Sequence, residues 1–109
     1  MNFTGRVLTI TSCIPHGRIT TYGAIAKCAG SPGSSRMVGW ILHTTKNHPA
    51  FIPAHRVVNR NGQLTGRKHF SGPDTMRQLL ENENIKITDN QVTQFSKLFW
   101  DPSKELEIE

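Results

Sequence analysis

The sequence predicts one mainly α-helical domain with short strands, arranged as a winged helix-turn-helix. Two observations lead to this fold class: a pair of short helices separated by the turn Gly-Ser-Pro-Gly at residues 30–33, and a basic Asn-Gly hairpin further along the chain. A chain of 109 residues can bury a hydrophobic core without disulfides or metals. We therefore expect a single domain over residues 1–100, followed by an acidic, flexible tail over residues 101–109.

The first two helices follow from apolar spacing and from a capping residue. Apolar residues recur at helical spacing from Phe3 onward, which predicts an amphipathic helix over residues 2–13. Thr21 can cap a shorter helix that runs to about Ala29, because a threonine hydroxyl accepts a hydrogen bond from the free N–H groups of a first turn. The turn at residues 30–33 then ends this second helix.

The helix after that turn is informative on both faces. We expect it to run from Ser34 or Ser35 to about His43. Its apolar stripe comprises Met37, Val38, Ile41 and Leu42. Arg36 and Gly39 fall on the opposite side. A glycine inside a helix costs about 1 kcal/mol relative to alanine, so Gly39 indicates a close approach by a nucleic-acid backbone or by a neighbouring helix.

The rest of the domain reads as a hairpin, a third helix and a closing segment. Strand character at Val57–Val58 and Gln63–Leu64, joined across an Asn-Gly pair, predicts a hairpin with Arg60 at its tip. A third helix opens near Ser71, its candidate cap. The inner stripe of that helix comprises Met76, Leu79, Leu80 and Glu83. Apolar residues over 85–100 predict a closing strand and helix.

Glu83 is unusual because it falls on an apolar stripe, and a carboxylate that faces a core needs a partner. The candidates are His55 and Arg56 in the segment FIPAHRVV; the alternative is that Glu83 ends its helix in solvent. A contact with Glu83 would fix the tautomer and orientation of the His55 imidazole, as in sites that activate a nucleophile. The neighbour of His55 is nevertheless Ala54, which carries no reactive group.

The charges are distributed unevenly along the chain. Residues 1–73 contain nine Lys or Arg and no Asp or Glu, whereas the remainder holds all eight acidic residues and four Lys or Arg, for a net charge of +5. A long segment without carboxylates attracts polyanions, since each phosphate that it neutralises releases condensed counterions. The composition therefore favours a nucleic-acid partner over a basic surface that is merely solvated.

Several other classes of protein are disfavoured. No apolar run is long enough to span a membrane and the first residues lack a signal-peptide pattern, so we expect a cytoplasmic protein, nucleoid-associated if bacterial, with no membrane partner. Cys13 and Cys28 have neither a disulfide pattern nor metal-ligand spacing, and we expect both to be buried, structural thiols. The sequence indicates no metal site and no cofactor.

The segment IPAHRVV, residues 52–58, resembles the Ile-Pro-Cys-His-Arg-Val-Val signature of the O6-alkylguanine-DNA alkyltransferases, with Ala54 in place of the acceptor cysteine. Other segments follow that family's order and approximate spacing: GRITTYGAIA (17–26), SSRMVGW (34–40), FSGP (70–73) and LLENE (79–83). The resemblance covers about residues 3–90 and implies the fold of the family's C-terminal, DNA-binding domain. With alanine at the acceptor position, the chain resembles the alkyltransferase-like proteins, which bind alkylated guanine in DNA without removing the alkyl group.

The resemblance also implies roles for individual residues. Arg36 matches the arginine that replaces the extruded nucleotide in the base stack, and His55 with Glu83 matches the pair that activates the cysteine in the enzymes. Further contacts with DNA are expected from Tyr22, Ser34, Ser35, Gly39 and Arg60. The pocket for the alkylated base would be formed by Tyr22, Ala54, Val57, Arg67, Ser71 and Gly72. The connection over residues 41–50 is one residue longer than usual, so either His43 or Thr44 stands at the family's hinge asparagine.

Alkyl transfer to protein requires a thiolate, and Ala54 supplies only a methyl group. We therefore expect a monomer that is not an enzyme, binds O6-alkylguanine in duplex DNA by base flipping, and marks the lesion for nucleotide excision repair proteins. Two alternatives remain: a winged-helix regulator that reads intact DNA, and an alkyltransferase that uses another cysteine.

Overall fold

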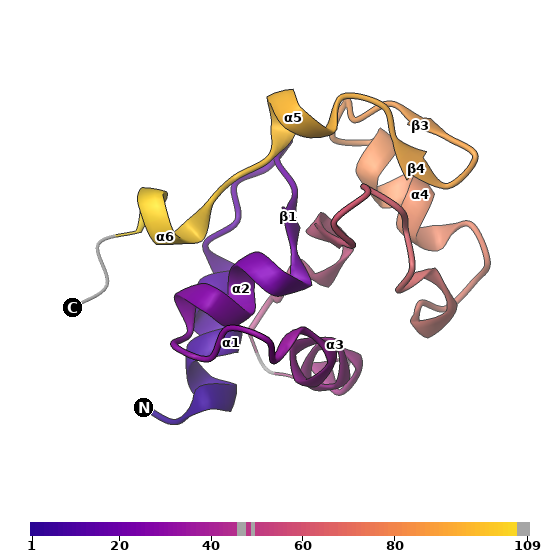
Figure 1. Cartoon of the computed structure of the whole chain (residues 1–109). Coiled ribbons are helices and arrows are strands. Elements are labelled where there is room, and N and C mark those ends of the chain that lie inside the picture. The colour runs from indigo at the N-terminus through magenta and orange to yellow at the C-terminus, as the bar shows by residue number, and fades with distance from the viewer. Residues whose placement is uncertain (46–47, 49, 107–109) are drawn as a thin grey trace.

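Two hydrophobic cores meet at a pair of short parallel strands, β1 (Thr20–Thr21) and β2 (Val57–Val58). The computed structural model describes residues 1–45, 48 and 50–106. Figure 1 shows the helices of the first core at one end of the molecule and α4 with β3 and β4 at the other, with β1 running between them. The domain is mainly helical with short strands, as the sequence predicts.

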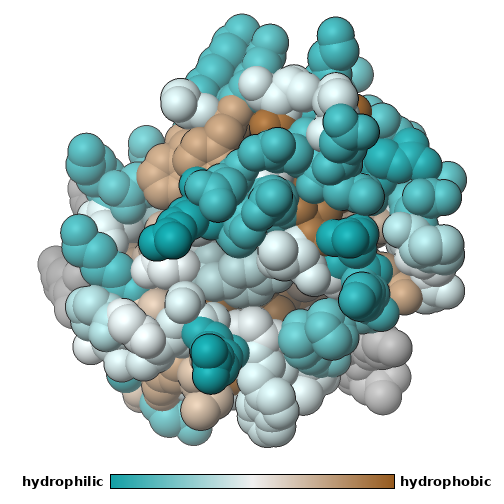
Figure 2. Space-filling view, turned by 45° about the vertical axis from the view of Figure 1, so that its right-hand side comes forward, coloured by the Kyte–Doolittle hydropathy of each residue, from teal (hydrophilic) through white to brown (hydrophobic). Residues whose placement is uncertain are grey.

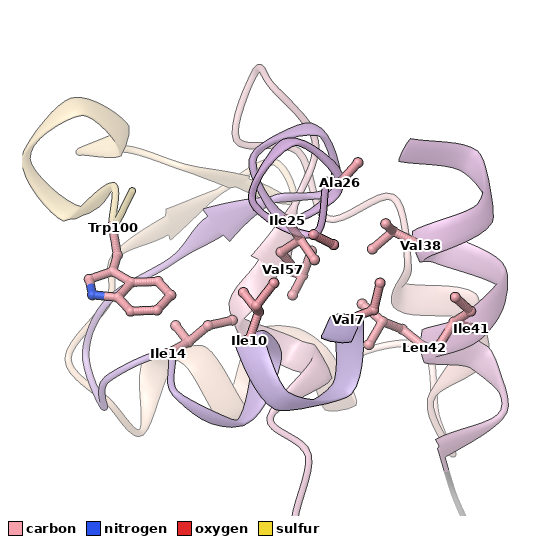
Figure 3. Packing of buried hydrophobic residues seen from close by; sticks show 11 residues of the cluster. Val7, Ile10, Ile14, Ile25, Ala26, Val38, Ile41, Leu42, Val57 and Trp100 are labelled. Atoms are coloured by element: carbon pink, nitrogen blue, oxygen red, sulfur yellow. The ribbon is translucent and has the colours of Figure 1, made fainter. Parts of the chain in front are cut away.

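The first core lies between α1 (Phe3–Ser12), α2 (Tyr22–Cys28) and α3 (Ser35–His43). The side chain of Asn2 caps α1, and the Thr21 hydroxyl accepts a hydrogen bond from the backbone N–H of Ala24 at 3.0 Å, which confirms the predicted start of α2. These helices close over a set of aliphatic side chains and one tryptophan (Figure 3): Val7, Ile10, Ile14, Ile25, Ala26, Val38, Ile41, Leu42, Val57 and Trp100.

The predicted inner stripe of α3 is wrong at one position. Val38, Ile41 and Leu42 are buried as expected, but Met37 is 51% exposed and Trp40 is 64% exposed. Helical residues share a face at spacings of three and four, and Val38 with Ile41 and Leu42 satisfies that spacing. Met37 is four residues before Ile41, but at about 100° per residue it lies about 100° from Val38 and about 140° from Leu42, at the edge of this face, where it is exposed.

The second core is built on α4 (Thr75–Glu81), the antiparallel strands β3 (Ile87–Thr88) and β4 (Gln91–Val92), and α5 (Phe95–Leu98). Its buried side chains are Ile19, Val58, Leu64, Met76, Leu80, Ile85 and Val92. Two details of the predicted third helix are wrong. The helix begins at Thr75, after a turn that holds Pro73, so Ser71 does not cap it, and Leu79 is 37% exposed.

The predicted hairpin between Val57–Val58 and Gln63–Leu64 is also wrong. A turn does form there, with Gly62 at φ 78° and its N–H donating to Asn59 O at 2.9 Å. However, Val57–Val58 pairs with Thr20–Thr21, and Gln63 bridges Gln91 instead. Successive strand residues point to opposite sides, so Val57 enters the first core (Figure 3) and Val58 the second. Burial of both valines decides the pairing, a long-range effect that the Asn-Gly signal does not carry.

The segment after Trp100, for which we expected a flexible tail, contains a short helix. Residues 102–105 form α6 (Pro102–Glu105), whose first turn is capped by the Asp101 side chain, which accepts from Ser103 N at 3.0 Å. Pro102 is buried and Leu106 packs against the first core, so apolar contacts hold this acidic segment in place. Residues 107–109 lie outside the described residues. No helix in the described part of the chain is long and apolar enough to cross a membrane.

Candidate nucleic-acid interface

Glu83 receives hydrogen bonds from two separate segments of the chain. The His55 Nε2 atom lies 2.7 Å from Glu83 Oε2, and the Arg56 guanidinium donates to the same carboxylate through Nε and Nη2 at 2.9–3.1 Å. The backbone N–H of Gly17 donates to Oε1 at 2.9 Å. The prediction that Glu83 pairs with His55 and Arg56 is therefore confirmed. Together these contacts fix the short helix η2 (Ala54–Arg56) against the end of α4.

The protonation states of this network follow from its geometry. Burial would raise the pKa of the Glu83 carboxyl, but hydrogen bonds from Arg56, Gly17 and His55 outweigh burial and lower the pKa to about 2. Burial lowers the pKa of His55, and the opposing effect of the Glu83 carboxylate does not restore it. At neutral pH, Glu83 is thus ionised and His55 is neutral. The imidazole donates its Nε2 proton to Glu83, which leaves Nδ1 as an acceptor.

A cavity of about 540 Å³ opens beside Ala54. Its walls come from α2, the end of α3, the segment that precedes η2, and the region of η3 (Arg67–His69) with the residues after it. Tyr22, Ala54 and Ser71, which we predicted for the base pocket, line this cavity. Val57, Arg67 and Gly72 are not part of the lining: Val57 is buried in the first core, and Arg67 donates to Leu64 O at 3.0 Å. The volume lies within the range of small-molecule sites and suits a nucleobase-sized group.

Tyr22 is held between two glycines. A Cβ atom added at Gly66 would lie 2.8 Å from the Tyr22 hydroxyl, so only glycine fits there without movement of the ring. A Cβ atom added at Gly39 would lie 3.7 Å from the Tyr22 ring, which is an ordinary van der Waals contact. Burial raises the pKa of the Tyr22 phenol, with an opposing hydrogen bond from Thr65, so the phenol is neutral at physiological pH.

The N-terminal half of α3 presents a second, shallower hollow of about 560 Å³. It is lined by Gly33, Ser34, Arg36, Met37 and Trp40. Ser34 is half-buried, and its hydroxyl lies 2.7 Å from that of Ser31, so it caps no N–H of α3. Arg36 and Ser35 are exposed, as is Arg60 on the turn after β2. Figure 2 shows that hydrophilic side chains cover most of the face in view, with small hydrophobic areas between them.

Sequence reasoning missed two aromatic groups at the 540 Å³ cavity. The rings of His43 and His69 stack there with centroids 3.2 Å apart, which brings the end of α3 onto η3. Phe51, 71% exposed, also lines the cavity. Nothing in the local sequence predicts the histidine contact, because it joins segments that are far apart along the chain. Phe51 stands directly before the Ile-Pro pair, and this position could have indicated that it lies at the site.

The two cysteines lie away from the 540 Å³ cavity. Cys13 is exposed and Cys28 half-buried, which corrects the expectation that both are buried. Neither thiol lines the cavity, and burial raises the pKa of Cys28, which disfavours its thiolate. In the described part of the chain no group of three or more His, Cys, Asp or Glu side chains is placed to hold a metal ion.

Comparisons with known proteins agree on one family. Residues 2–85 match the family described as 6-O-methylguanine DNA methyltransferase, DNA binding domain. A DNA base-flipping protein of Escherichia coli is 44% identical over 77 residues, which are 71% of this chain and 56% of that protein. A methylated-DNA–protein-cysteine methyltransferase of Methanosarcina acetivorans is 48% identical over 71 residues, 64% of this chain and 43% of the enzyme. The chain thus spans about half the length of these relatives.

The fold is also that of a solved complex. The structure of Schizosaccharomyces pombe Atl1 with damaged DNA containing O6-carboxymethylguanine superposes with a TM-score of 0.78 at 27% identity, over 90% of this chain and 94% of that one. The match therefore extends over nearly the whole of both chains. By sequence and by fold, the chain belongs to the family of the 6-O-methylguanine DNA methyltransferase DNA-binding domain.

Proposed function

We propose that this protein binds O6-alkylguanine in duplex DNA by extruding the damaged nucleotide into the cavity beside Ala54, and that it leaves the alkyl group in place. Tyr22, Ala54 and Ser71 all line the cavity, which has room for a base with a substituent. The names of its relatives support the proposal: one is a DNA base-flipping protein, and another is bound to DNA with an O6-modified guanine.

Extrusion of a nucleotide costs a few kcal/mol of unpairing and unstacking, and less at a damaged pair. Arg36 offsets this cost by filling the gap in the stack. The structure supports that role because Arg36 is exposed near the start of α3, a position from which a long cation can enter a groove. Damage sensing is then a difference in affinity, since an alkylated guanine pairs weakly and its substituent finds room beside the Ala54 methyl group.

The observation that carries the proposal is the contrast between Ala54 and its neighbours. Glu83 still orients His55 at 2.7 Å, as a site that activates a nucleophile requires, yet the adjacent position holds only a methyl group. Such a site retains its shape and lacks the atom that would accept the alkyl group. A bound lesion would therefore persist, and the long-lived complex would mark the damage for nucleotide excision repair proteins.

The test compares two duplexes that differ only by one O6-methyl group. We expect tighter binding of the methylated duplex and no transfer of a labelled methyl group to the protein. Ala54→Cys is the matched variant for transfer, and we expect it to take up label, because His55 and Glu83 are already aligned. Equal affinity for both duplexes would favour a regulator that reads intact DNA, and label on the unaltered protein would show an enzyme that uses another cysteine.

A further inference from the structure

We propose that the stacked pair His43–His69 is a contact site for negatively charged O6 substituents, so that this protein prefers adducts carrying a carboxylate, and prefers them more strongly at lower pH. The proposal rests on the proposed function, since it assigns a ligand class to the same cavity. It concerns two residues that neither base extrusion nor the Glu83 contacts use.

The position of the pair is the first argument. Both imidazoles line the cavity that Ala54 also lines, one from the end of α3 and one from η3. Their rings are stacked at 3.2 Å with an angle of 28° between the planes. A substituent that extends from the O6 atom of a base seated beside Ala54 enters a space with these rings on its wall. In the proposed complex, the pair would therefore lie beside the variable part of the lesion.

The charges around the pair are the second argument. The described residues that line the cavity include no Asp, Glu, Lys or Arg; their titratable groups are Tyr22, His43, His48 and His69. Tyr22 is neutral, because burial raises the pKa of its phenol. The other charged side chains of η3, Arg67 and Lys68, are cations. Glu83 is the carboxylate that contacts η2, and it is already paired with His55 and Arg56. No described acid of the lining competes with an incoming carboxylate.

The direction of the pH effect follows from the stacking. Burial lowers the pKa of His43, and the charge of His69 lowers it further, because two imidazoles in contact resist a second proton. His43 is therefore neutral at neutral pH. In the proposed complex, a carboxylate beside the rings would favour the protonated imidazole and raise the pKa of His43. Binding then takes up a proton, so the gain in affinity is fullest at acid pH and is lost as the pH rises through the pKa of the complex.

The experiment measures affinities for three duplexes that carry guanine, O6-methylguanine or O6-carboxymethylguanine at one position, from about pH 5.5 to about pH 8, the range in which histidine titrates. We expect the preference for the carboxymethyl over the methyl adduct to rise by about tenfold toward the acid end, which corresponds to a pKa change of about one unit. The ionic strength is held constant, because DNA contacts depend on salt.

Two variants assign the effect to the pair. His43→Phe and His69→Phe each keep an aromatic ring in the stack and remove one titrating group, and we expect each to flatten the pH dependence of the preference. His16→Gln is the control: it removes an exposed imidazole that does not line the cavity, and we expect it to behave as the unaltered protein does. Circular dichroism verifies that each variant is folded, and each phenylalanine variant tests the assignment independently of the other.

Each outcome has a distinct meaning. A carboxymethyl preference that does not change with pH overturns the proposal. An equal pH dependence for both adducts also overturns it, since it assigns the imidazoles to a DNA phosphate, which both duplexes contain. If neither adduct binds more tightly than guanine, the failure lies with the proposed function, because the cavity then takes no O6-modified base.

Discussion

Two parts of the molecule use arginine in opposite ways. Arg56 is 11% exposed in its side chain and is bonded to Glu83 and to the carbonyl of Ile14 at 2.9 Å, so its charge is neutralised inside the fold. Arg36 is exposed on the α3 face, the surface formed by Gly33, Ser34, Arg36, Met37 and Trp40, and has no hydrogen bond or ion pair with any described residue. The first arginine holds structure together, whereas the second is available to a partner.

The difference separates a structural role from a proposed binding role. The Glu83 network consists of Glu83, His55, Arg56 and the N–H of Gly17. It resembles catalytic machinery, but it also joins η2 and the turn at Gly17 to a residue just after α4. The structural role of the network does not depend on the side chain at position 54, since Ala54 takes no part in the hydrogen bonds of the network. We therefore expect stability to depend on Arg56 and binding on Arg36, and variants can separate the two.

The largest effect is expected at Glu83. Glu83→Ala leaves the largely buried Arg56 cation without its partner, and we expect a loss of about 3–5 kcal/mol in the free energy of unfolding. Chemical denaturation followed by circular dichroism measures the loss. The control is Glu81→Ala, which breaks an exposed pair with Arg77 and should cost at most about 1 kcal/mol. Similar losses in the two variants would show that the Glu83 network is not a structural element.

A change of pH tests the same network without removing a side chain. The pKa of Glu83 is lowered from 4.5 to about 2, so its contribution to stability is complete above pH 4.5 and is lost as the pH falls from there toward 2. We expect a loss of up to about 3 kcal/mol over that interval. Glu83→Gln should lose less stability over the same pH interval, which is measured by denaturation at several pH values. Parallel curves for the two proteins would contradict the assignment.

Arg36 should behave in the opposite manner. Arg36→Ala should reduce affinity for a duplex with O6-methylguanine by about tenfold or more, while the free energy of unfolding changes by less than about 0.5 kcal/mol. Fluorescence of a base analogue opposite or beside the lesion reports extrusion directly. Arg77→Ala, on α4, is the matched loss of an arginine and should leave binding nearly unchanged. Unaltered extrusion in Arg36→Ala would remove the proposed role in the base stack.

These contrasts explain which features the sequence predicts and which it does not. Local signals were sufficient for α2 and for the Glu83 contacts, because a capping threonine and a carboxylate on an apolar stripe have few alternatives. The pairing of Val57–Val58 with Thr20–Thr21 was not predictable, since it depends on burial on both sides of a strand. The His43–His69 contact is likewise a property of the folded chain.

The smallest expected effect on stability is at Gly39, where a substitution can distinguish a structural role from a binding role. Its added Cβ would touch the Tyr22 ring at an ordinary 3.7 Å, so the folded protein alone does not require glycine there. Gly39→Ala should raise the free energy of unfolding by up to about 1 kcal/mol, because alanine is the better helix former. If a DNA backbone approaches this position, the same variant binds the lesion duplex less tightly.

Gly66→Ala is the contrast, because its Cβ would meet the Tyr22 hydroxyl at 2.8 Å and should destabilise the protein itself. Denaturation and duplex affinity are measured on both variants. If Gly39→Ala is more stable and binds less tightly, Gly39 contacts DNA. If Gly39→Ala is less stable, Gly39 is required for helix packing.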